Sequence, residues 1–322
     1  MRRSARELSA PLRLGLFGAG LAAVFGAAVL VGQFVVPPDA VVAWAEQGRP
    51  EGEAHEGDGR VAVTHGGGGA EHEAGAAGTG PAEVPGLSIE ADGYRFADVT
   101  TPGAAGEPGE VRFRIIGPDA RPVTGFEITH EKPLHLIVVR TDGSSFRHVH
   151  PQLASDGTWT MPWTWDDAGS YRLFADFRPA GHDRTLTLTS SATVTGDVHG
   201  SDLPASGERV AVAGPFTVEL AGALVPGAAS DLTFTVRRDG VPVTTIEPYL
   251  GAAGHLVMLR AGDLGYLHVH PLDEAETAGA DGLGPDIRFG ATPPTPGAYF
   301  LYLDFQVDGE VYTARFAADA GP

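Results

Sequence analysis

The sequence predicts an all-β protein with two β-sandwiches in tandem, which follow one N-terminal membrane segment and a linker. Three observations lead to this fold class: a long apolar run near the N-terminus, an internal repeat, and apolar residues that alternate with a period of two. The chain has 322 residues, which is more than one hydrophobic core usually supports, so its length also favours two domains.

The apolar run covers residues 14–36 and contains no charged side chain. A helix of this length crosses a hydrocarbon core of about 30 Å, so we expect a transmembrane helix or signal anchor. Four arginines precede the run, and the positive-inside rule therefore places residues 1–13 in the cytoplasm and the C-terminal domains outside, on a single-pass protein of the cell membrane. An Ala-Trp-Ala sequence at residues 43–45 resembles a signal-peptide cleavage site, and cleavage there would give a secreted protein instead.

Two segments have the composition of linkers. Residues 37–85 are rich in Gly and Glu, include three histidines and hold few large apolar residues, so they cannot bury enough surface to offset the entropy lost on ordering. We expect a flexible Gly/Glu/His tether there, and a second, shorter linker over residues 196–205.

Between and after these linkers the chain repeats itself. Residues 126–151 align without a gap on residues 246–271, at a constant offset of 120. Further on, residues 169–177 align on residues 297–305 at an offset of 128. The repeat predicts two homologous domains with a short insertion in the second.

The predicted domains, residues 86–195 and 206–320, each have about the length of an immunoglobulin-like sandwich. Apolar residues alternate along predicted strands of both domains, as at Val111, Phe113 and Ile115 in the first and at Leu232, Phe234 and Val236 in the second. Gly, Pro and Asp-Gly turns separate these strands, and no long helical pattern competes with them.

Tyrosine positions support an immunoglobulin-like fold. Tyr171 and Tyr299 close the segments Asp-Ala-Gly-Ser-Tyr and Pro-Gly-Ala-Tyr, which resemble the tyrosine corner at the start of strand F. Asp308-Gly309 after this strand predicts a tight hairpin to the last strand.

Histidine spacing indicates where chemistry would occur. Three histidines recur at identical spacing: His135, His148 and His150 in the first copy, and His255, His268 and His270 in the second. If Asp142-Gly143 is a two-residue hairpin turn, the strand register sets His135 opposite His150, and by analogy His255 opposite His270. Cross-strand neighbours have Cβ atoms about 4.5–5.5 Å apart, a separation at which two imidazoles can share one metal ion.

Each copy also places a carboxylate near this pair. Asp176 and Asp304 occupy equivalent positions on a later strand, which in an immunoglobulin-like sheet lies beside the strand that carries His135 or His255. The sequence therefore predicts two equivalent metal sites, one in each sandwich. Their predicted ligands are His135, His148, His150 and Asp176 in the first, and His255, His268, His270 and Asp304 in the second.

Composition limits the chemistry of these sites. The chain has no cysteine, which excludes disulfides, thiolate nucleophiles and Cys-based metal sites. Imidazole and carboxylate ligands suit copper(II) or zinc(II). The net charge is −19, so the chain lacks the basic surface that nucleic-acid binding requires, and we expect no nucleic-acid partner.

The second copy also carries a family resemblance. Its segments EPYLGAAGHLVMLRAGDLGYLHVHP and PGAYFLYLDF resemble extracytoplasmic YtkA-like domains and, more distantly, CopC-type copper carriers. The resemblance implies an extracytoplasmic immunoglobulin-like sandwich that is associated with heavy-metal handling. CopC-type sites use a free mature N-terminus, whereas the N-terminus is predicted to be cytoplasmic here, so the ligand prediction depends on spacing alone.

The predicted function is therefore a membrane-anchored, non-enzymatic protein that binds or delivers copper(II) or zinc(II). Its predicted partners are the metal ion, the membrane and a candidate extracytoplasmic protein. A second interpretation is a scaffold module in which the histidines only fix strand register, and in which an outward apolar face binds another protein or the neighbouring domain. That face comprises Ile137, Val139, Phe146, Phe174, Val257, Leu259, Tyr266, Phe300 and Tyr302.

A third interpretation is a metalloenzyme. His268, His270 and Glu274 match part of the cupin motif HxHxxxE, but the first copy has no equivalent glutamate. His130 and His182 have no counterparts in the second copy, and we interpret both as ordinary surface residues.

Overall fold

The computed structural model describes residues 86–200, 203, 206–267, 269–272 and 283–321. The predicted membrane segment, the long linker, His268 and Glu274 lie outside the described residues. Within the described part of the chain there is no helix, and therefore none that is long and apolar enough to span a membrane.

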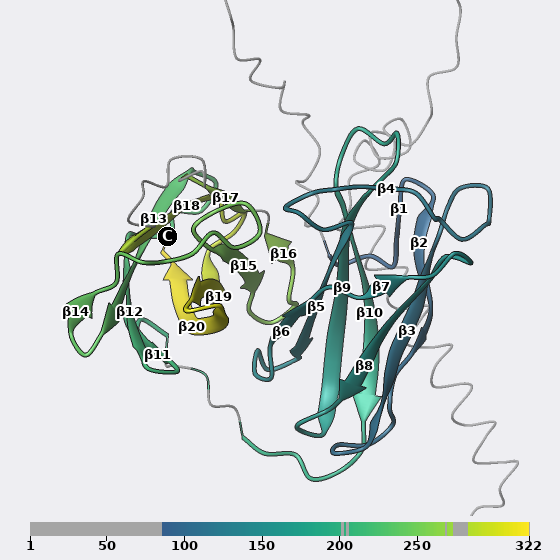
Figure 1. Cartoon of the computed structure of the whole chain (residues 1–322), viewed down its shortest axis with the longest axis horizontal. Coiled ribbons are helices and arrows are strands. Elements are labelled where there is room, and N and C mark those ends of the chain that lie inside the picture. The colour runs from purple at the N-terminus through teal and green to yellow at the C-terminus, as the bar shows by residue number, and fades with distance from the viewer. Residues whose placement is uncertain (1–85, 201–202, 204–205, 268, 273–282, 322) are drawn as a thin grey trace, which may run out of the picture. The chain divides into compact units, whose positions relative to one another are not determined.

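The first sandwich is built from two antiparallel sheets, with strand orders β1-β2-β3-β8-β7 and β10-β9-β5-β6 (Figure 1). The short strand β4 pairs with β9. The strands described in this sandwich are β1 (Glu90–Ala91), β2 (Tyr94–Thr100), β3 (Pro108–Ile116), β4 (Phe126–Glu127), β5 (Leu134–Arg140), β6 (Arg147–Val149), β7 (Gln152–Leu153), β8 (Thr158–Thr164), β9 (Gly169–Pro179) and β10 (Leu186–Val194).

The second sandwich repeats this plan, with strand orders β11-β12-β13-β18-β17 and β16-β15-β19-β20, and with β14 on β13. Its described strands are β11 (Val210–Ala213), β12 (Phe216–Ala221), β13 (Ser230–Arg238), β14 (Val241–Pro242), β15 (His255–Arg260), β16 (Tyr266–Leu267), β17 (Val269–Pro271), β18 (Asp286–Ala291), β19 (Gly297–Val307) and β20 (Glu310–Ala320). The all-β class and the tandem immunoglobulin-like sandwiches are thus confirmed.

The apolar residues that alternate along the strands lie on the buried faces, as predicted. Val111, Phe113 and Ile115 on β3 are at most 1% exposed and belong to the first core, which also takes in Trp159, Trp163 and Trp165. The equivalent strand β13 contributes its own alternate apolar residues to the second core. Each sandwich therefore has a separate hydrophobic core between its two sheets.

Both tyrosine corners are present. The Tyr171 hydroxyl donates to the Asp167 carbonyl at 2.8 Å, and the Tyr299 hydroxyl donates to the Thr295 carbonyl at 2.7 Å. The predicted hairpin between β19 and β20 also forms, with Asp308 and Gly309 at φ 55° and 76°. These left-handed conformations are typical of a type I′ turn.

A third apolar cluster lies between the sandwiches. It comprises Ile137, Val139, Phe146 and Phe174 from the first sandwich and Val257, Leu259, Leu264, Tyr266 and Tyr302 from the second, with Leu203 and Phe300 packed against it. The Phe146 and Tyr302 rings stack at a centroid distance of 4.0 Å, and the Tyr302 hydroxyl donates to the Gly143 carbonyl at 2.5 Å. The outward apolar face predicted from the sequence is thus covered by the neighbouring sandwich, and Leu203 of the predicted short linker packs on it.

Candidate metal centre

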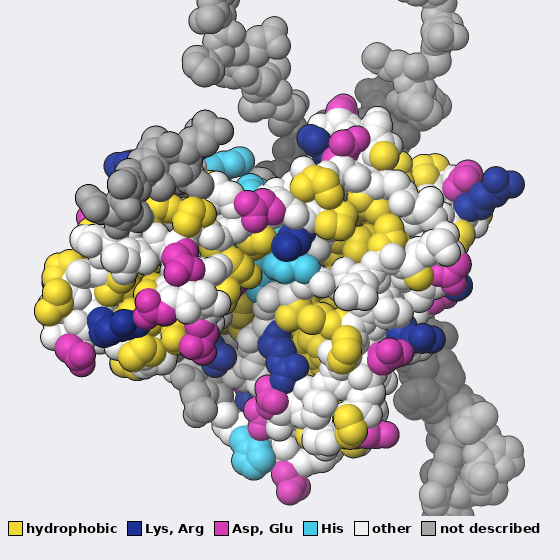
Figure 2. Space-filling view, viewed as in Figure 1, with side chains coloured by type: hydrophobic (Ala, Val, Ile, Leu, Met, Phe, Trp, Pro, Cys, Tyr) yellow, Lys and Arg dark blue, Asp and Glu magenta, His cyan; other side chains and the backbone are white. Residues whose placement is uncertain are grey.

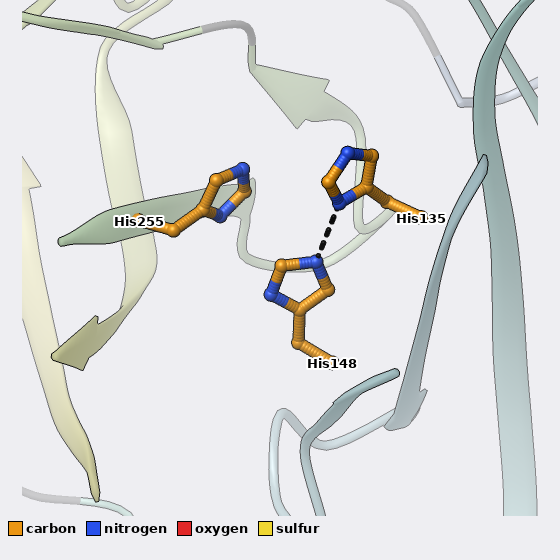
Figure 3. Close-up of side chains that lie close together, drawn as sticks. All are labelled: His135, His148 and His255. Atoms are coloured by element: carbon orange, nitrogen blue, oxygen red, sulfur yellow. Dashed lines mark hydrogen bonds between the residues drawn. The ribbon is translucent and has the colours of Figure 1, made fainter. Parts of the chain in front are cut away.

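Three histidines converge where the two sandwiches meet. His135 and His148 come from the first sandwich and His255 comes from the second, and each offers a ring nitrogen within 4.8 Å of the others (Figure 3). Figure 3 shows the nitrogen-bearing edge of the His255 ring facing the other two rings. On the surface, histidine side chains appear beside a basic side chain near the centre of the view (Figure 2).

Alternation along β5 places His135 in this cluster. Leu134, Leu136 and Val138 point into the first core, so His135 points outward with Ile137 and Val139 toward the second sandwich. His135 is 1% exposed as a result. The β-strand period therefore puts a polar ring on an otherwise apolar, covered face.

The predicted register between β5 and β6 is confirmed. Leu136 pairs with Val149 and Ile137 with His148, which continues to His135 opposite His150. The His150 Nε2 atom lies 3.1 Å from His135 Nδ1. The turn itself is longer than the predicted two residues, because the strands end at Arg140 and begin again at Arg147.

Hydrogen bonds fix where the protons of two rings lie. His135 Nε2 is 3.0 Å from the Thr129 carbonyl oxygen, and His148 Nδ1 is 2.9 Å from Asp304 Oδ2. A carbonyl and a carboxylate only accept hydrogen bonds, so each of these nitrogens carries the proton. In the neutral rings, His135 Nδ1 and His148 Nε2 are then both unprotonated.

When both rings are neutral, two unprotonated nitrogens therefore face each other. His135 Nδ1 and His148 Nε2 are 3.0 Å apart, and His150 Nε2 approaches the same His135 atom. Two lone pairs at this distance repel, and only a proton or a cation between them makes the contact favourable. Two nitrogen ligands of a tetrahedral zinc ion are about 3.3 Å apart, so a small adjustment would admit an ion.

His255 completes the group from the opposite sandwich. Its ring stacks on His135 at a centroid distance of 5.5 Å and lies 4.5 Å from the His148 centroid. Its Nδ1 atom is buried and has no hydrogen-bond partner among the described residues. A buried ring nitrogen without a partner is costly in a folded protein and is one that a metal ion would satisfy.

Burial keeps most of these rings neutral. Burial, followed by repulsion from a charge on His148, lowers the pKa of His135 to about 3 and that of His150 to about 3. Burial also lowers the pKa of His255 well below its usual value. Neutral imidazole is the form that binds transition metals, so at neutral pH these rings are ready to act as ligands.

The two predicted aspartates have different surroundings. Asp304 accepts from the Thr313 hydroxyl at 2.6 Å through its Oδ1 atom and from His148 through its Oδ2 atom. Asp176 accepts from the Thr187 hydroxyl at 2.6 Å and pairs in register with His135, as predicted. Neither aspartate belongs to the group of three histidines itself. Asp304 therefore orients a candidate ligand of the first sandwich. The prediction of a separate site in each sandwich did not include this role.

The second copy does not form the predicted His255–His270 pair. The register of β15 and β16 is the one expected, with Met258 opposite Leu267. Beyond Leu267 the chain crosses to the other sheet, where His270 pairs with Gly290 of β18 and is exposed. The reason is an early change of sheet: β16 has only two residues, so His270 forms its backbone ladder with β18 and not with β15.

His130, which the sequence suggested to be an ordinary surface residue, lies beside this cluster. Its ring centroid lies 6.0 Å from that of His135 and 5.8 Å from that of His255, so it borders the cluster rather than an unrelated surface. His182, in contrast, contacts Tyr94 and Asp92. The second copy has no histidine equivalent to His130, so the repeat gave no sign that His130 lies at the site. A site shared by two domains need not be symmetric.

Comparison with known proteins establishes the family. A model of a domain of unknown function, DUF8832, matches residues 89–194 and again residues 210–321. The chain belongs to the DUF8832 family. The two copies of DUF8832 correspond to the two sandwiches, and the family model supports the internal repeat without assigning a role to it.

The other comparisons assign no function to this chain. A search of curated proteins returns no match. Among solved structures, a Salmonella alpha-2-macroglobulin mutant is 16% identical with a TM-score of 0.24, and the match covers 74% of this chain and 15% of that chain. The bacterial integrin-binding protein invasin is 12% identical with a TM-score of 0.22, covering 70% of this chain and 39% of that one. A putative membrane anchored protein from Corynebacterium diphtheriae is 9% identical with a TM-score of 0.22, covering 72% and 59%.

Proposed function

We propose that this DUF8832 protein binds one copper(II) or zinc(II) ion per chain, at a histidine site shared by its two sandwiches. The ligands are His135, His148 and His255, with His150 beside them. In this proposal the N-terminal segment anchors the protein in the membrane, and the sandwiches hold the ion on the extracytoplasmic side.

One observation carries the proposal. His135 Nδ1 and His148 Nε2 face each other at 3.0 Å, while the Thr129 carbonyl and the Asp304 carboxylate hold the protons of both rings on their opposite nitrogens. Metal-binding histidines commonly donate their second N–H to a carbonyl or carboxylate in this way. An all-imidazole site suits zinc(II) and copper(II), and three such ligands leave a position for a fourth group.

A titration tests the proposal. The full chain, prepared in detergent without a polyhistidine tag and stripped with a chelator, is titrated calorimetrically with Cu(II) or Zn(II), and the bound metal is counted by elemental analysis. We expect about one tightly bound equivalent, because the ligands of the two sandwiches belong to one group. The double variant His135→Ala/His148→Ala should lose it.

Two matched controls separate this site from weaker ones. The variant His182→Ala/His199→Ala removes two histidines outside the cluster and should still bind about one equivalent of metal. A variant with the three linker histidines His55, His65 and His72 changed to Ala should also keep it. If the cluster variant binds as wild type does, or if the wild-type chain binds neither metal, the proposal is wrong.

The absence of metal binding would favour the scaffold interpretation. The 3.0 Å contact would then be a hydrogen bond from a doubly protonated His148 ring, which the Asp304 carboxylate stabilises across the two sandwiches. In that case the cluster variant should lower the free energy of unfolding without changing any metal titration.

A further inference from the structure

The turn that carries His130 has an unusual backbone. Thr129 and Lys132 exchange two backbone hydrogen bonds, at 3.0 and 3.1 Å, across the two residues between them. Those residues, His130 and Glu131, have φ values of 48° and 64°. Left-handed backbone is disfavoured for both side chains, so this two-residue turn is strained.

The second sandwich makes the same turn with more suitable residues. Tyr249 and Ala252 exchange the corresponding backbone bonds at 2.8 and 3.3 Å, and the residues between them are Leu250 and Gly251, with φ values of 56° and 82°. Glycine adopts this conformation without strain. The first copy therefore carries two side chains where one glycine would relieve the backbone, which indicates a use for the side chains.

The strained turn directs one of these side chains to the metal centre. The His130 ring centroid lies 6.0 Å from that of His135 and 5.8 Å from that of His255. Separations within the cluster are similar, at 5.3 Å for His135 and His148 and 5.5 Å for His135 and His255. His130 is therefore near enough to share an ion with the cluster after a small movement.

His130 differs from the cluster in exposure. It is exposed, whereas His135 is buried and the Nδ1 atom of His255 is buried. His130 and His255 also line one small cavity, together with Leu250, Leu256, Val269 and Phe289. The cavity thus joins an exposed imidazole to a partly buried one whose Nδ1 atom lacks a hydrogen-bond partner, and its other lining residues are apolar.

From this arrangement we propose that His130 is an exchange ligand, which takes the ion from solvent and passes it to the buried histidines. The inference rests on the proposed metal site and adds the route by which the ion enters and leaves. An ion that moves along this path exchanges water for the His130 imidazole, and then exchanges that imidazole for a buried one. At each stage an imidazole nitrogen replaces a ligand that is lost, so the ion is never without ligands beside the apolar lining residues.

Exchange kinetics test this role. The variant His130→Asn removes the imidazole and keeps a residue that tolerates left-handed backbone. Stopped-flow transfer of Zn(II) between the full chain and a chromophoric chelator gives the rates of uptake and release. We expect both rates to fall by on the order of tenfold, while the equilibrium affinity changes by less than about threefold, because a transient ligand alters the path and not the end state.

Two controls accompany the exchange experiment. Glu131→Gly keeps His130 and relieves the turn, and His182→Asn removes a histidine outside the cluster; both should exchange at the wild-type rate. Unchanged rates in His130→Asn would overturn the proposal, and so would a loss of affinity with unchanged uptake, because that result would make His130 a resident ligand. A wild-type chain that binds no Zn(II) would instead refute the metal site itself, and the exchange role with it.

Discussion

His148 Nδ1 in the first sandwich donates to Asp304 Oδ2 in the second at 2.9 Å, joining residues that are 156 positions apart in the sequence. The His148 side chain is 1% exposed and that of Asp304 is 3% exposed, so the bond lies away from solvent. It ties the orientation of a candidate metal ligand in one sandwich to a carboxylate in the other.

Replacing this carboxylate should weaken metal binding. Asp304→Asn removes the charge that orients and polarises the His148 ring, and losses of this kind cost about 10- to 100-fold in metal affinity. Asp176→Asn is the matched control, because Asp176 has the same place in the repeat and the same kind of bond to a threonine, whereas Asp304 is the carboxylate that accepts from His148. Competition titration with a chelator measures both variants, and equal losses would contradict the distinct role of Asp304.

The local part of this site was predictable from the sequence, and its assembly was not. Period-two alternation and the turn between β5 and β6 determine which residues lie opposite each other, so the pairing of His135 with His150 follows from nearby residues alone. The repeat implied two equal sites. Instead, the apolar faces of the two sandwiches pack together and bring His255 against His135, a contact that depends on side chains more than 100 residues apart.

The second copy gives a matched test of which histidines belong to the centre. His255→Ala removes a partly buried ring that faces the cluster and should abolish tight binding of the single ion. His270→Ala removes an exposed ring on β17, which pairs with β18 in the other sheet, and should keep full stoichiometry. Elemental analysis after dialysis distinguishes them, and a loss of half the bound metal in each variant would instead favour one site in each sandwich.

Stacking between Phe146 and Tyr302 should contribute strongly to the packing of the two sandwiches. Phe146→Ala removes a ring that is 5% exposed, and truncations of buried aromatic residues cost about 3–5 kcal/mol of unfolding free energy. Tyr302→Phe leaves the Gly143 carbonyl without its hydroxyl donor and should cost about 1–3 kcal/mol. Urea unfolding measures both effects. The control Tyr312→Phe, which removes an exposed hydroxyl that donates to Glu310, should stay within about 0.5 kcal/mol.

The stability of the metal-free protein should depend on pH through the buried histidines. His135 and His150 have pKa values of about 3 in the folded protein, against about 6.5 in the unfolded chain. Between these values the unfolded chain binds more protons, so their contribution is complete above pH 6.5 and is lost as the pH falls toward 3.

Comparison with a variant isolates this pH effect from the other charges of an acidic chain. Urea unfolding after chelator treatment, at pH 7.5, 6 and 5, should show a smaller decrease in unfolding free energy for His135→Leu than for the wild-type protein. Identical decreases in the two proteins would mean that His135 does not remain neutral in the folded state.

The paired turns predict opposite effects of glycine. Glu131→Gly places glycine at a φ of 64° and should raise the free energy of unfolding by about 0.5–1 kcal/mol, because relief of left-handed strain exceeds the added entropy of the unfolded chain. Gly251→Ala introduces that strain at a φ of 82° in the second copy, where a Cβ atom would meet no other atom within 4 Å. It should lower stability by about 1–2 kcal/mol through backbone strain alone. Thermal and urea unfolding check both signs, and a destabilised Glu131→Gly variant would mean that contacts of the Glu131 side chain outweigh the strain of its backbone.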